Sequence, residues 1–512
     1  MVDNQHSIPR QGKVGGGSLY DLYKQHPCIT TDSRDCPEGS IFIALHGDKF
    51  DGNQFALQAL EKGCAYAIVD RELGDTSQTS NLKSQIIKVP DTLQALKDIA
   101  REHRRQFDIP VIAITGTNGK TTTKELVRAV LSEKYNVLAT EGNFNNDVGV
   151  PKTLLRLTKE HEIAIIEMGA SHPGDIKTLA ETAEPTCGII TNVGRAHLQG
   201  FGSFEGVCRT KRELYDFLCK REDGLVFLNA DNDDLLDMLE AAEASAPAVP
   251  LAPEAPVAPV APEAPEAPEA PLAPEAPLAP LAPESPGQLW ITPYSTDPEK
   301  QYTCISGEIL REEGNPLLKL RWRRPLMDLE ESGASQKWHK VQTQLIGDYN
   351  IDNVLAAIAV GINFDVDRKS ICHALESYVP SNSRSQLMDT TKNRLIVDAY
   401  NANPTSMMAA LENFLLMQPA PGQQKMAILG DMLELGPASH EEHQKIADML
   451  RDAGLEHVWF VGHEFAATRT DYRVFANVDE VKAELQQHCP EGCLILIKGS
   501  NSTRLHQLPP LL

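Results

Sequence analysis

Several features that mark common classes of protein are missing from this 512-residue sequence. It has no excess of basic residues, because 48 lysines and arginines stand against 71 acidic residues, a formal net charge of −23. Non-specific nucleic-acid binding depends on basic side chains that replace counterions, so the composition argues against a nucleic-acid partner. No apolar run approaches the roughly 20 residues that a membrane-spanning helix needs, so we expect no membrane insertion.

The ten cysteines lack any pairing pattern: there is no C-x-x-C, and the closest two are Cys489 and Cys493. In a chain of this length that spacing indicates reduced, mostly buried thiols and a cytoplasmic protein. The first residues, MVDNQHSIPRQGKVGGGSLY, contain no apolar core of the kind that a secretory signal has. We expect residues 1–19 to form a disordered tail.

The stretch ITGTNGKTTTKE (residues 114–125) lacks the first glycine of the phosphate-loop pattern G-x-x-x-x-G-K-[ST], because Ile114 stands in its place. The apolar run VIAI precedes this loop and a helical pattern follows it, a context in which backbone N–H groups hold phosphates. We predict that Lys120 contacts the β- and γ-phosphates of ATP and that Thr121 binds Mg²⁺. The predicted nucleotide-binding residues of the loop are Gly116, Thr117, Asn118, Gly119, Lys120, Thr121 and Thr122.

Apolar runs alternate with helical patterns along the chain, as in IFIAL (41–45), VIAI (111–114) and CLILIKGS (493–500). This alternation predicts an α/β fold in which parallel sheets carry helices on both faces. The length predicts about three domains. The predicted parts are a small α/β domain over 20–107, a central ATP-binding domain with a parallel sheet over 108–380, and a Rossmann-like domain over 381–512.

One segment of the central part does not fit this alternation. From Pro247 to Pro286 proline recurs at every third position, fourteen times in all, with Ala, Val, Leu and Glu between. Proline lacks the N–H that helices and sheets need, whereas polyproline II has three residues per turn and accommodates this period. We interpret residues 245–288 as a surface insertion without a catalytic role. A ligand for a proline-recognising partner is the alternative.

Two polar side chains follow apolar runs of the central part. Glu167 ends the run IAIIEMG, and His197 follows the run CGIITNVG at 187–194. Ligands of open parallel sheets bind beyond the carboxyl ends of the strands, and a carboxylate after four apolar residues is costly unless it faces a cation or a pocket. A magnesium-binding role is therefore plausible for both. A solvent-facing carboxylate and a structural histidine remain the alternatives.

Four strings in order, TGTNGKTTT, NFNNDVGVPKTLL, EMGASHPGDI and TNVGRAHLQGFGSFEGVCRTKREL, resemble the central domain of the Mur ligases. These ATP-dependent enzymes build the stem peptide of peptidoglycan, and the short loop without the first glycine is their normal form. The segment GDYNIDNVLAAIAVG (347–361) is similar to the family's adenine-binding segment. Asn350 and Asn353 match the two asparagines of that segment.

Within the family, DAYNANP (398–404) and GDMLELG (430–436) resemble the branch that adds D-alanyl-D-alanine to UDP-N-acetylmuramoyl-tripeptide. TDSR (31–34) is similar to the UDP-sugar-binding part of that branch, which would cover 20–107. The string D-N-P-R of many diaminopimelate-adding relatives is missing. The sequence departs from the family pattern at three positions, where histidine, glutamate and arginine are common: Asn53, Gln199 and Asn501.

The resemblance implies a mechanism in which ATP converts the tripeptide's terminal carboxylate to an acyl phosphate, which the amine of D-alanyl-D-alanine then attacks. It implies catalytic roles for Lys120, Glu167, His197 and Lys211. Lys211 would be carbamylated by CO₂ and would hold a second Mg²⁺ together with Glu167 and His197. Arg384 would contact phosphate and Asp398 the ribose. The implied substrate-binding residues are Ser33, Arg34, Asn145, Asn146, Tyr400, Asn401 and Asn403.

Two other functions remain open at this point. One is a different ligase of the superfamily, such as a folylpolyglutamate synthase, and the other is a P-loop switch or non-catalytic nucleotide-binding module. The resemblance favours a cytoplasmic, monomeric enzyme that uses ATP and Mg²⁺ and whose partners are the tripeptide and the dipeptide. The third residue of the tripeptide, diaminopimelate or lysine, is not determined by these motifs.

Overall fold

A computed structural model describes residues 18–47, 50–73, 82–246, 289–300, 302–312, 315–325, 337–380 and 384–512. The predicted tail and the proline-rich insertion lie outside the described residues, apart from their edges at Ser18, Leu19, Ser245 and Ala246. The chain forms two compact units. Unit 1 comprises residues 1–109, 140–161 and 178–184, and unit 2 comprises 110–139, 162–177 and 185–512.

Unit 1 contains a four-stranded parallel sheet in the order β1-β2-β5-β6, which confirms the α/β expectation for this part of the chain. Alternate residues of β2 enter different cores: Ile41 and Ile43 pack with α1 and α4, while Phe42 and Ala44 pack with α2. Both faces of the sheet are therefore covered. The elements are α1 (Leu19–Gln25), β1 (Ile29–Thr30), β2 (Ile41–Ile43), β3 (His46–Gly47), β4 (Phe50–Asp51), α2 (Ala56–Glu61), β5 (Tyr66–Val69), β6 (Ile86–Lys88), α4 (Thr92–Arg104) and α6 (Gly149–Leu154).

The first sheet of unit 2 has nine strands in the order β15-β14-β13-β12-β11-β10-β7-β9-β8. It is parallel from β8 to β13, as expected for the phosphate-loop domain, but β14 and β15 add an antiparallel edge that the sequence analysis did not predict. The strands are β7 (Val111–Thr115), β8 (Val137–Ala139), β9 (Ile163–Glu167), β10 (Cys187–Ile190), β11 (Leu225–Asn229), β12 (Trp290–Ser295), β13 (Ile305–Ile309), β14 (Leu317–Arg323) and β15 (His339–Ile346).

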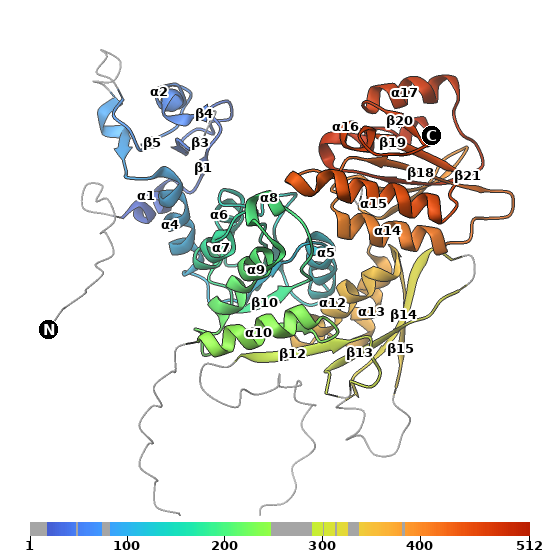
Figure 1. Ribbon diagram of the computed structural model, residues 1–512. Coiled ribbons are helices and arrows are strands. Elements are labelled where there is room, and N and C mark those ends of the chain that lie inside the picture. The colour runs from blue at the N-terminus through green and yellow to red at the C-terminus, as the bar shows by residue number, and fades with distance from the viewer. Residues whose placement is uncertain are drawn as a thin grey trace, which may run out of the picture. The chain divides into compact units, whose positions relative to one another are not determined.

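Helices cover both faces of this sheet (Figure 1). Ile189 of β10 packs into the core with α5, α12 and α13, whereas a Cβ on its neighbour Gly188 would meet Leu214 and Leu218 of α9. Because successive side chains of a strand point to opposite faces, α9 lies on the face opposite α5 and α12. The helices are α5 (Lys120–Leu131), α8 (Leu198–Phe201), α9 (Phe204–Leu218), α10 (Asp233–Ser245), α12 (Ile351–Asn363) and α13 (Arg368–Ser377). Residues of α7 (Asp175–Ala183) are assigned partly to each unit.

The last part of unit 2 has a six-stranded sheet in the order β16-β17-β21-β18-β19-β20. Only β16, at one edge, is antiparallel, so the expected Rossmann-like arrangement is confirmed. One face packs on α14 and α15 and the other on α17. The elements are β16 (Gln386–Asp389), β17 (Arg394–Asp398), α14 (Pro404–Leu416), β18 (Gln424–Gly430), α15 (Ser439–Asp452), β19 (His457–Val461), α16 (His463–Ala466), β20 (Arg473–Phe475), α17 (Val478–Gln487) and β21 (Cys493–Lys498).

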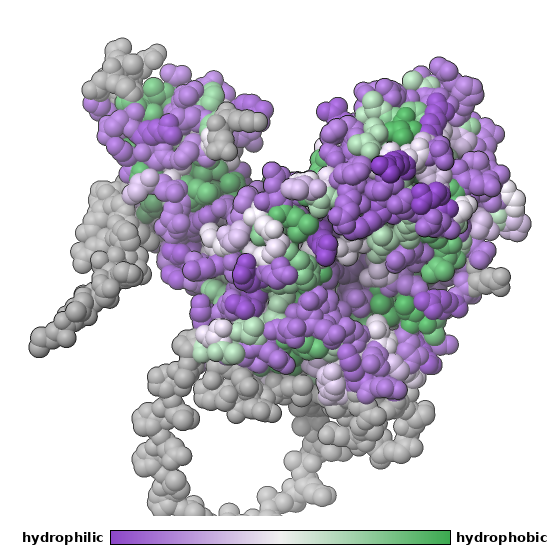
Figure 2. Space-filling view, in the orientation of Figure 1, coloured by the Kyte–Doolittle hydropathy of each residue, from purple (hydrophilic) through white to green (hydrophobic). Residues whose placement is uncertain are grey.

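Hydrophilic residues cover most of the described surface on the face that Figure 2 shows. In the part of the chain that the structure describes, no helix is both long and apolar enough to cross a membrane. All ten cysteines are free thiols, as expected. Four are partly buried, Cys28 is exposed, and the other five are buried: Cys64, Cys187, Cys219, Cys304 and Cys493.

We predict that deleting residues 246–286 leaves the protein folded and retains the ligase activity that the resemblance implies. The residues that flank the insertion lie side by side, because the Leu289 N–H donates to Glu243 Oε1 at 3.3 Å, so a short connection can join α10 to β12. Shortening a surface loop also recovers about 0.6 kcal/mol of closure free energy for each halving of its length. Thermal melting would measure folding, and the kcat for ADP release would measure activity.

The matched control replaces residues 246–286 with a Gly/Ser linker of equal length. This variant changes the sequence of the insertion but keeps its length. A folded deletion variant that has lost most of its kcat would contradict the interpretation of the insertion as non-catalytic.

Candidate phosphate and magnesium site

The phosphate loop joins β7 to α5 and depends on two glycines. Gly116 has a φ of +139° and Gly119 a φ of +80°, conformations that side chains rarely allow. A Cβ on Gly116 would lie 2.0 Å from Thr191 Oγ1, and one on Gly119 would lie 2.6 Å from Asn353 Oδ1. Ile114, by contrast, is fully buried inside β7, which continues to Thr115. The turn therefore begins after residue 114, and no glycine is needed there.

The loop is held in shape by the segment after β10. The Thr117 N–H donates to the Asn192 carbonyl at 2.9 Å, and the Asn118 N–H donates to Asn192 Oδ1 at 3.0 Å. The Gly194 N–H donates to Thr117 Oγ1 at 2.9 Å. The sequence analysis missed Thr191 and Asn192. Their place directly after a strand of the same sheet was the signal that could have found them.

Lys120, the first residue of α5, is turned back onto its own loop. Its ammonium donates to the carbonyls of Gly116 at 2.7 Å and Thr117 at 2.9 Å. Burial lowers the pKa of Lys120 to about 8, the Glu167 carboxylate opposes that shift, and the Arg384 charge adds to it. A phosphate in the loop would supply the negative charge that this buried ammonium needs.

Glu167 ends β9 and is 1% exposed. The Thr121 hydroxyl lies 3.1 Å from its Oε1 and 3.0 Å from its Oε2, so the structure brings these two predicted magnesium ligands together. The Lys124 ammonium lies 3.8 Å from Glu167 Oε2. The carboxylate therefore faces polar and charged groups of α5 and does not point into solvent.

Lys124 is a member of this site that the sequence analysis missed. Its side chain is 1% exposed and forms an ion pair with Glu125 at 3.0 Å in addition to the contact with Glu167. Lys120 and Lys124 are one helical turn apart and share a face of α5. That spacing could be read from the sequence, but it did not predict a buried side chain because a lysine in a helix is usually exposed.

His197 and Lys211 meet at the ring of Phe201. The His197 ring centroid lies 6.3 Å from that of Phe201, and the Lys211 ammonium lies 5.9 Å from the same ring. Lys211 is 3% exposed, and its Nζ lies 3.5 Å from Thr115 Oγ1. Burial, followed by the charge of Lys120, lowers the pKa of Lys211 well below its usual value. Burial also lowers the pKa of His197, which the paired carboxylate of Glu434 opposes.

The donor set at this sheet edge fits Mg²⁺, which prefers oxygen ligands. Thr121 and Glu167 supply a hydroxyl and a carboxylate within contact of each other. Across the described ranges, no group of three or more His, Cys, Asp or Glu side chains could hold a metal ion by itself. A complete coordination sphere would therefore need further oxygens, such as those of phosphate, water or a carbamate.

The residues expected at the adenine are buried and bonded within the protein. Asn350 donates to the Ile346 carbonyl at 2.7 Å, and its Oδ1 accepts from Asn353 at 2.9 Å. The Oδ1 of Asn353 accepts from the Thr123 hydroxyl at 2.9 Å. These bonds tie the start of α12 to α5, and the adenine role of the pair remains a prediction.

The expected ribose and phosphate residues of the C-terminal part also have partners. Asp398 accepts from the Lys498 ammonium at 2.5 Å, and Lys498 is 2% exposed. The Arg384 guanidinium lies 3.9 Å from the centroid of the Tyr400 ring. Lys498 was missed in the sequence, although it stands beside Asp398 once β17 and β21 pair.

Asn403 and Asn401 differ in their surroundings. Asn403 caps α14, accepting from the Ser406 N–H at 2.9 Å, and it donates to Asn118 Oδ1 at 2.8 Å. The structure thus brings it to the phosphate loop. Asn401 is exposed.

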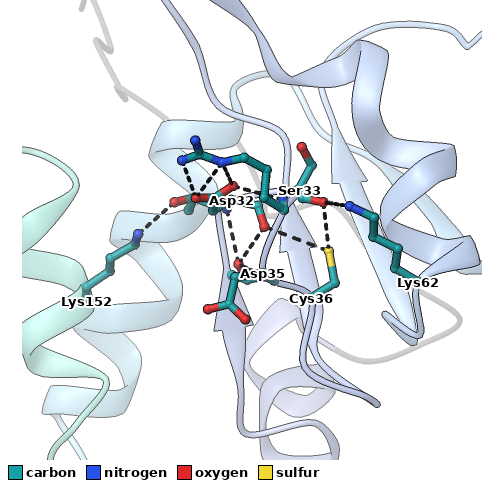
Figure 3. A network of polar contacts seen from close by, with 9 residues as sticks. Asp32, Ser33, Asp35, Cys36, Lys62 and Lys152 are labelled. Carbon is teal, nitrogen blue, oxygen red and sulfur yellow. Dashed lines mark hydrogen bonds and ion pairs between the residues drawn. The ribbon is translucent and has the colours of Figure 1, made fainter.

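The expected nucleotide-sugar residues belong to unit 1 and lie in the loop after β1 (Figure 3). Arg34 pairs with Asp32 through two nitrogens, with Nη2 at 2.7 Å, and this contact keeps the pKa of Asp32 below its usual range. The Ser33 carbonyl accepts from the Lys62 ammonium at 2.7 Å. A polar network therefore fixes the backbone of this loop.

Asn145 and Asn146 also belong to unit 1, ahead of α6. Asn146 Oδ1 accepts from the Gly149 N–H at 2.9 Å, so this side chain helps to begin the helix. Asn145 is partly buried and Asn146 is exposed. Their proposed contact with substrate remains a prediction.

Comparisons with known proteins agree with one another. The Mur ligase family catalytic domain matches residues 27–104, the Mur ligase middle domain 114–255, and the Mur ligase glutamate ligase domain 383–501. UDP-N-acetylmuramoyl-tripeptide–D-alanyl-D-alanine ligase of Bacillus subtilis (strain 168) is 30% identical over 491 residues, which cover 94% of this chain and 92% of that protein.

Solved structures give the same result. MurF from Acinetobacter baumannii has a TM-score of 0.74 at 28% identity, covering 94% of this chain and 92% of that one. MurF ligase from Thermotoga maritima, solved in complex with ADP, has a TM-score of 0.73 at 23% identity over 96% of this chain and 97% of that one. The second likeness shows the fold alone.

We predict that Gly116→Ala weakens ATP binding by roughly tenfold or more, about 1.4 kcal/mol. The added Cβ would meet Thr191 Oγ1 and would be forced into a positive-φ conformation, so the loop must change shape. Isothermal titration calorimetry with ATP would measure the effect. Gly422→Ala is the matched control, because Gly422 has a φ of +84° but nothing within 4 Å of an added Cβ. Unchanged ATP affinity in Gly116→Ala would show that this close approach does not shape the loop.

Proposed function

This chain belongs to the Mur ligase family, and from that membership we propose that it is the ATP-dependent ligase that joins D-alanyl-D-alanine to the C-terminal carboxylate of UDP-N-acetylmuramoyl-tripeptide. The observation that carries this function is the match to the B. subtilis ligase along 94% of the chain. The reaction makes a precursor of peptidoglycan. Because it consumes ATP, we place it in the cytoplasm.

The alternative functions are not favoured. A non-catalytic nucleotide-binding module would account for the phosphate loop alone, and a folylpolyglutamate synthase would use the same ATP chemistry on a different acceptor. The match to the D-alanyl-D-alanine-adding ligase also runs through the N-terminal part at 27–104 and the C-terminal part at 383–501, where substrate specificity would be set.

The chemistry requires activation, because a carboxylate does not react with an amine. The γ-phosphate of ATP first passes to the terminal carboxylate of the tripeptide, and the acyl phosphate then reacts with the amine and releases phosphate. Most of the protein's contribution to such a reaction is positioning and charge neutralisation.

The phosphate loop and Lys120 would hold the nucleotide. Backbone N–H groups at the start of α5 would face the phosphates. Lys120 would leave the carbonyls of Gly116 and Thr117 for the β- and γ-phosphates, whose charge favours the protonated ammonium. Arg384, whose charge already acts on Lys120, would add a second cation near the phosphates.

Mg²⁺ would be held by Thr121 at one position and by Glu167, His197 and carbamylated Lys211 at the other. When bound, it would supply positive charge that offsets the charge on the phosphate groups. The Thr121 hydroxyl can donate to Glu167 and still offer an oxygen lone pair to Mg²⁺.

The remaining site residues would position the substrates. Ser33 and Arg34 would bind the nucleotide-sugar end, and Asp398 the ribose of ATP. Asn145 and Asn146 would contact substrate near the reacting groups. Three residues of the C-terminal part would also bind substrate: Tyr400, Asn401 and Asn403.

The direct test of this function is ADP release over a panel of nucleotide tripeptides and dipeptides. We expect release only when ATP, Mg²⁺, UDP-N-acetylmuramoyl-tripeptide and D-alanyl-D-alanine are all present. Tripeptides that end in diaminopimelate and in lysine should be compared. Equal ADP release with a folate and glutamate, or none with any pair, would contradict the proposal.

We also predict that Lys211 is carbamylated. Carbamylation needs a neutral amine, and the burial that lowers the pKa of Lys211 favours it. ¹³C NMR with labelled bicarbonate should show a carbamate signal in the wild type that Lys211→Ala lacks. Lys211→Ala should lower kcat by roughly 100-fold or more while ATP still binds.

Lys211→Arg is the matched charge control, because arginine stays positive and cannot become a carbamate. It should not restore activity. A fully active Lys211→Arg variant would contradict carbamylation and would indicate that Lys211 has only a structural role.

A further inference from the structure

The start of α14 lies against the phosphate loop. Asn403 donates from its Nδ2 to Asn118 Oδ1 at 2.8 Å, and Asn118 Nδ2 lies 3.4 Å from Asn403 Oδ1. The two residues are 285 positions apart in the sequence. This amide pair, Asn118 with Asn403, is a direct side-chain link between the phosphate loop and the C-terminal part of the chain.

Each partner of the amide pair is held in place by its own surroundings. The Asn118 N–H donates to Asn192 Oδ1 at 3.0 Å, and the Asn118 carbonyl accepts from the Thr191 hydroxyl at 2.5 Å. Asn403 is 5% exposed, and its Oδ1 accepts from the Ser406 N–H at 2.9 Å as the cap of α14. That bond turns the NH₂ group of Asn403 away from the helix and toward Asn118.

A second contact joins the same two segments. A Cβ on Gly194, in the turn after β10, would lie 2.9 Å from Thr405 Oγ1 and 3.5 Å from Thr117 Cγ2. Gly194 also donates its N–H to Thr117 Oγ1 at 2.9 Å. Thr405 of α14 and Thr117 of the phosphate loop therefore pack against one glycine. The start of α14 fits closely against the loop and the turn beside it.

This contact lies where the proposed reaction needs protection from water. The phosphate loop would hold the nucleotide, and the C-terminal part carries Arg384 and Asp398, which would contact phosphate and ribose. Water that attacked the acyl phosphate would release phosphate and regenerate the carboxylate, so the ATP would be wasted. Contact between the loop and the C-terminal part would exclude water while the intermediate exists, as closure does in other active sites.

We propose that Asn403 is a positioning residue of the ligation reaction: through Asn118 it holds the C-terminal part against the phosphate loop and so protects the acyl phosphate from water. This inference rests on the proposed ligase function. It differs from the role that the family resemblance implies, which is contact between Asn403 and substrate. Loss of the amide pair should therefore uncouple ADP release from amide formation and should not weaken substrate binding.

The test uses a variant of the full chain that removes the link but keeps the helix cap. Serine caps helices as well as asparagine does, but the side chain of Asn403→Ser is too short to reach Asn118. With ATP, Mg²⁺ and tripeptide but no D-alanyl-D-alanine, we expect ADP release to rise by roughly two- to tenfold, the effect of losing one hydrogen bond. With the dipeptide present, less than one amide should form per ADP, while both KM values stay within about twofold.

A second variant removes the same pair from the side of the loop. Asn118→Ala should have the effect of Asn403→Ser, and the double variant should be no worse than either, because the two side chains act through each other. Asn477→Ser is the matched control. Asn477 caps α17 in the same part of the chain and accepts from the N–H groups of Asp479 at 3.0 Å and Glu480 at 3.2 Å. This control should leave ADP release and amide yield unchanged.

Amide hydrogen exchange of the protein without ligands gives a readout that does not depend on activity. Asn118→Ala should speed exchange in the first turn of α14 by roughly two- to tenfold, although the substitution lies in another element. Asn477→Ser should leave exchange in that turn unchanged.

Unchanged ADP release and amide yield in Asn403→Ser would overturn the proposal. A higher KM for tripeptide or dipeptide without extra ADP release would also overturn it and would assign Asn403 to substrate binding. Additive losses in the double variant, or unchanged exchange in Asn118→Ala, would contradict action through the amide pair. A wild-type protein that forms no amide from any substrate pair would contradict the ligase function, and with it the protective role, whatever the exchange shows.

Discussion

A carboxylate buried at the carboxyl end of β9 constrains the whole central site. Glu167 is almost fully enclosed, and an ionised carboxylate in that position is costly unless donors and cations surround it. Thr121 and Lys124 of α5 provide them. These contacts tie the start of α5 to the end of β9. The phosphate loop and the candidate metal position therefore lie beside one charge-balanced contact between a helix and a strand.

The loop itself is shaped by contact with its neighbours. Gly116 lies against Thr191 and Gly119 against Asn353, so the turn after β10 and the start of α12 are built around the same few atoms. Asn353 links back to α5 through Thr123. A change of loop shape on nucleotide binding would therefore require α12 and the segment that leads to His197 to adjust, because both contact the loop.

Much of this arrangement could be predicted from the sequence, because it depends on local patterns. The apolar runs of β7, β9, β10 and β21 and the helix after the phosphate loop all form as expected. The antiparallel strands β14 and β15 were missed, although the alternation of apolar and charged residues in LLKLRWR is typical of a half-buried strand.

Such local patterns could not predict side-chain pairings between segments that are distant in the sequence. The contact of His197 with Glu434 joins positions 237 residues apart, and that of Asp398 with Lys498 joins positions 100 apart. Lys124 follows the periodicity of α5, but its burial depends on the charge of Glu167, whose proximity to Lys124 the sequence does not show. Sequence patterns thus predicted the sheet edge at which the site lies. The partners of its charged side chains depend on tertiary packing and could not be predicted.

We propose that Glu167 holds a metal position distinct from that of Thr121. It can be tested by titrating the protein with Mn²⁺, in the presence of a non-hydrolysable ATP analogue and the tripeptide, and counting bound ions by electron paramagnetic resonance. The account predicts two Mn²⁺ ions per chain for the wild type and one for Glu167→Gln, with the affinity for the ATP analogue retained. The same number of bound ions in both proteins would contradict it.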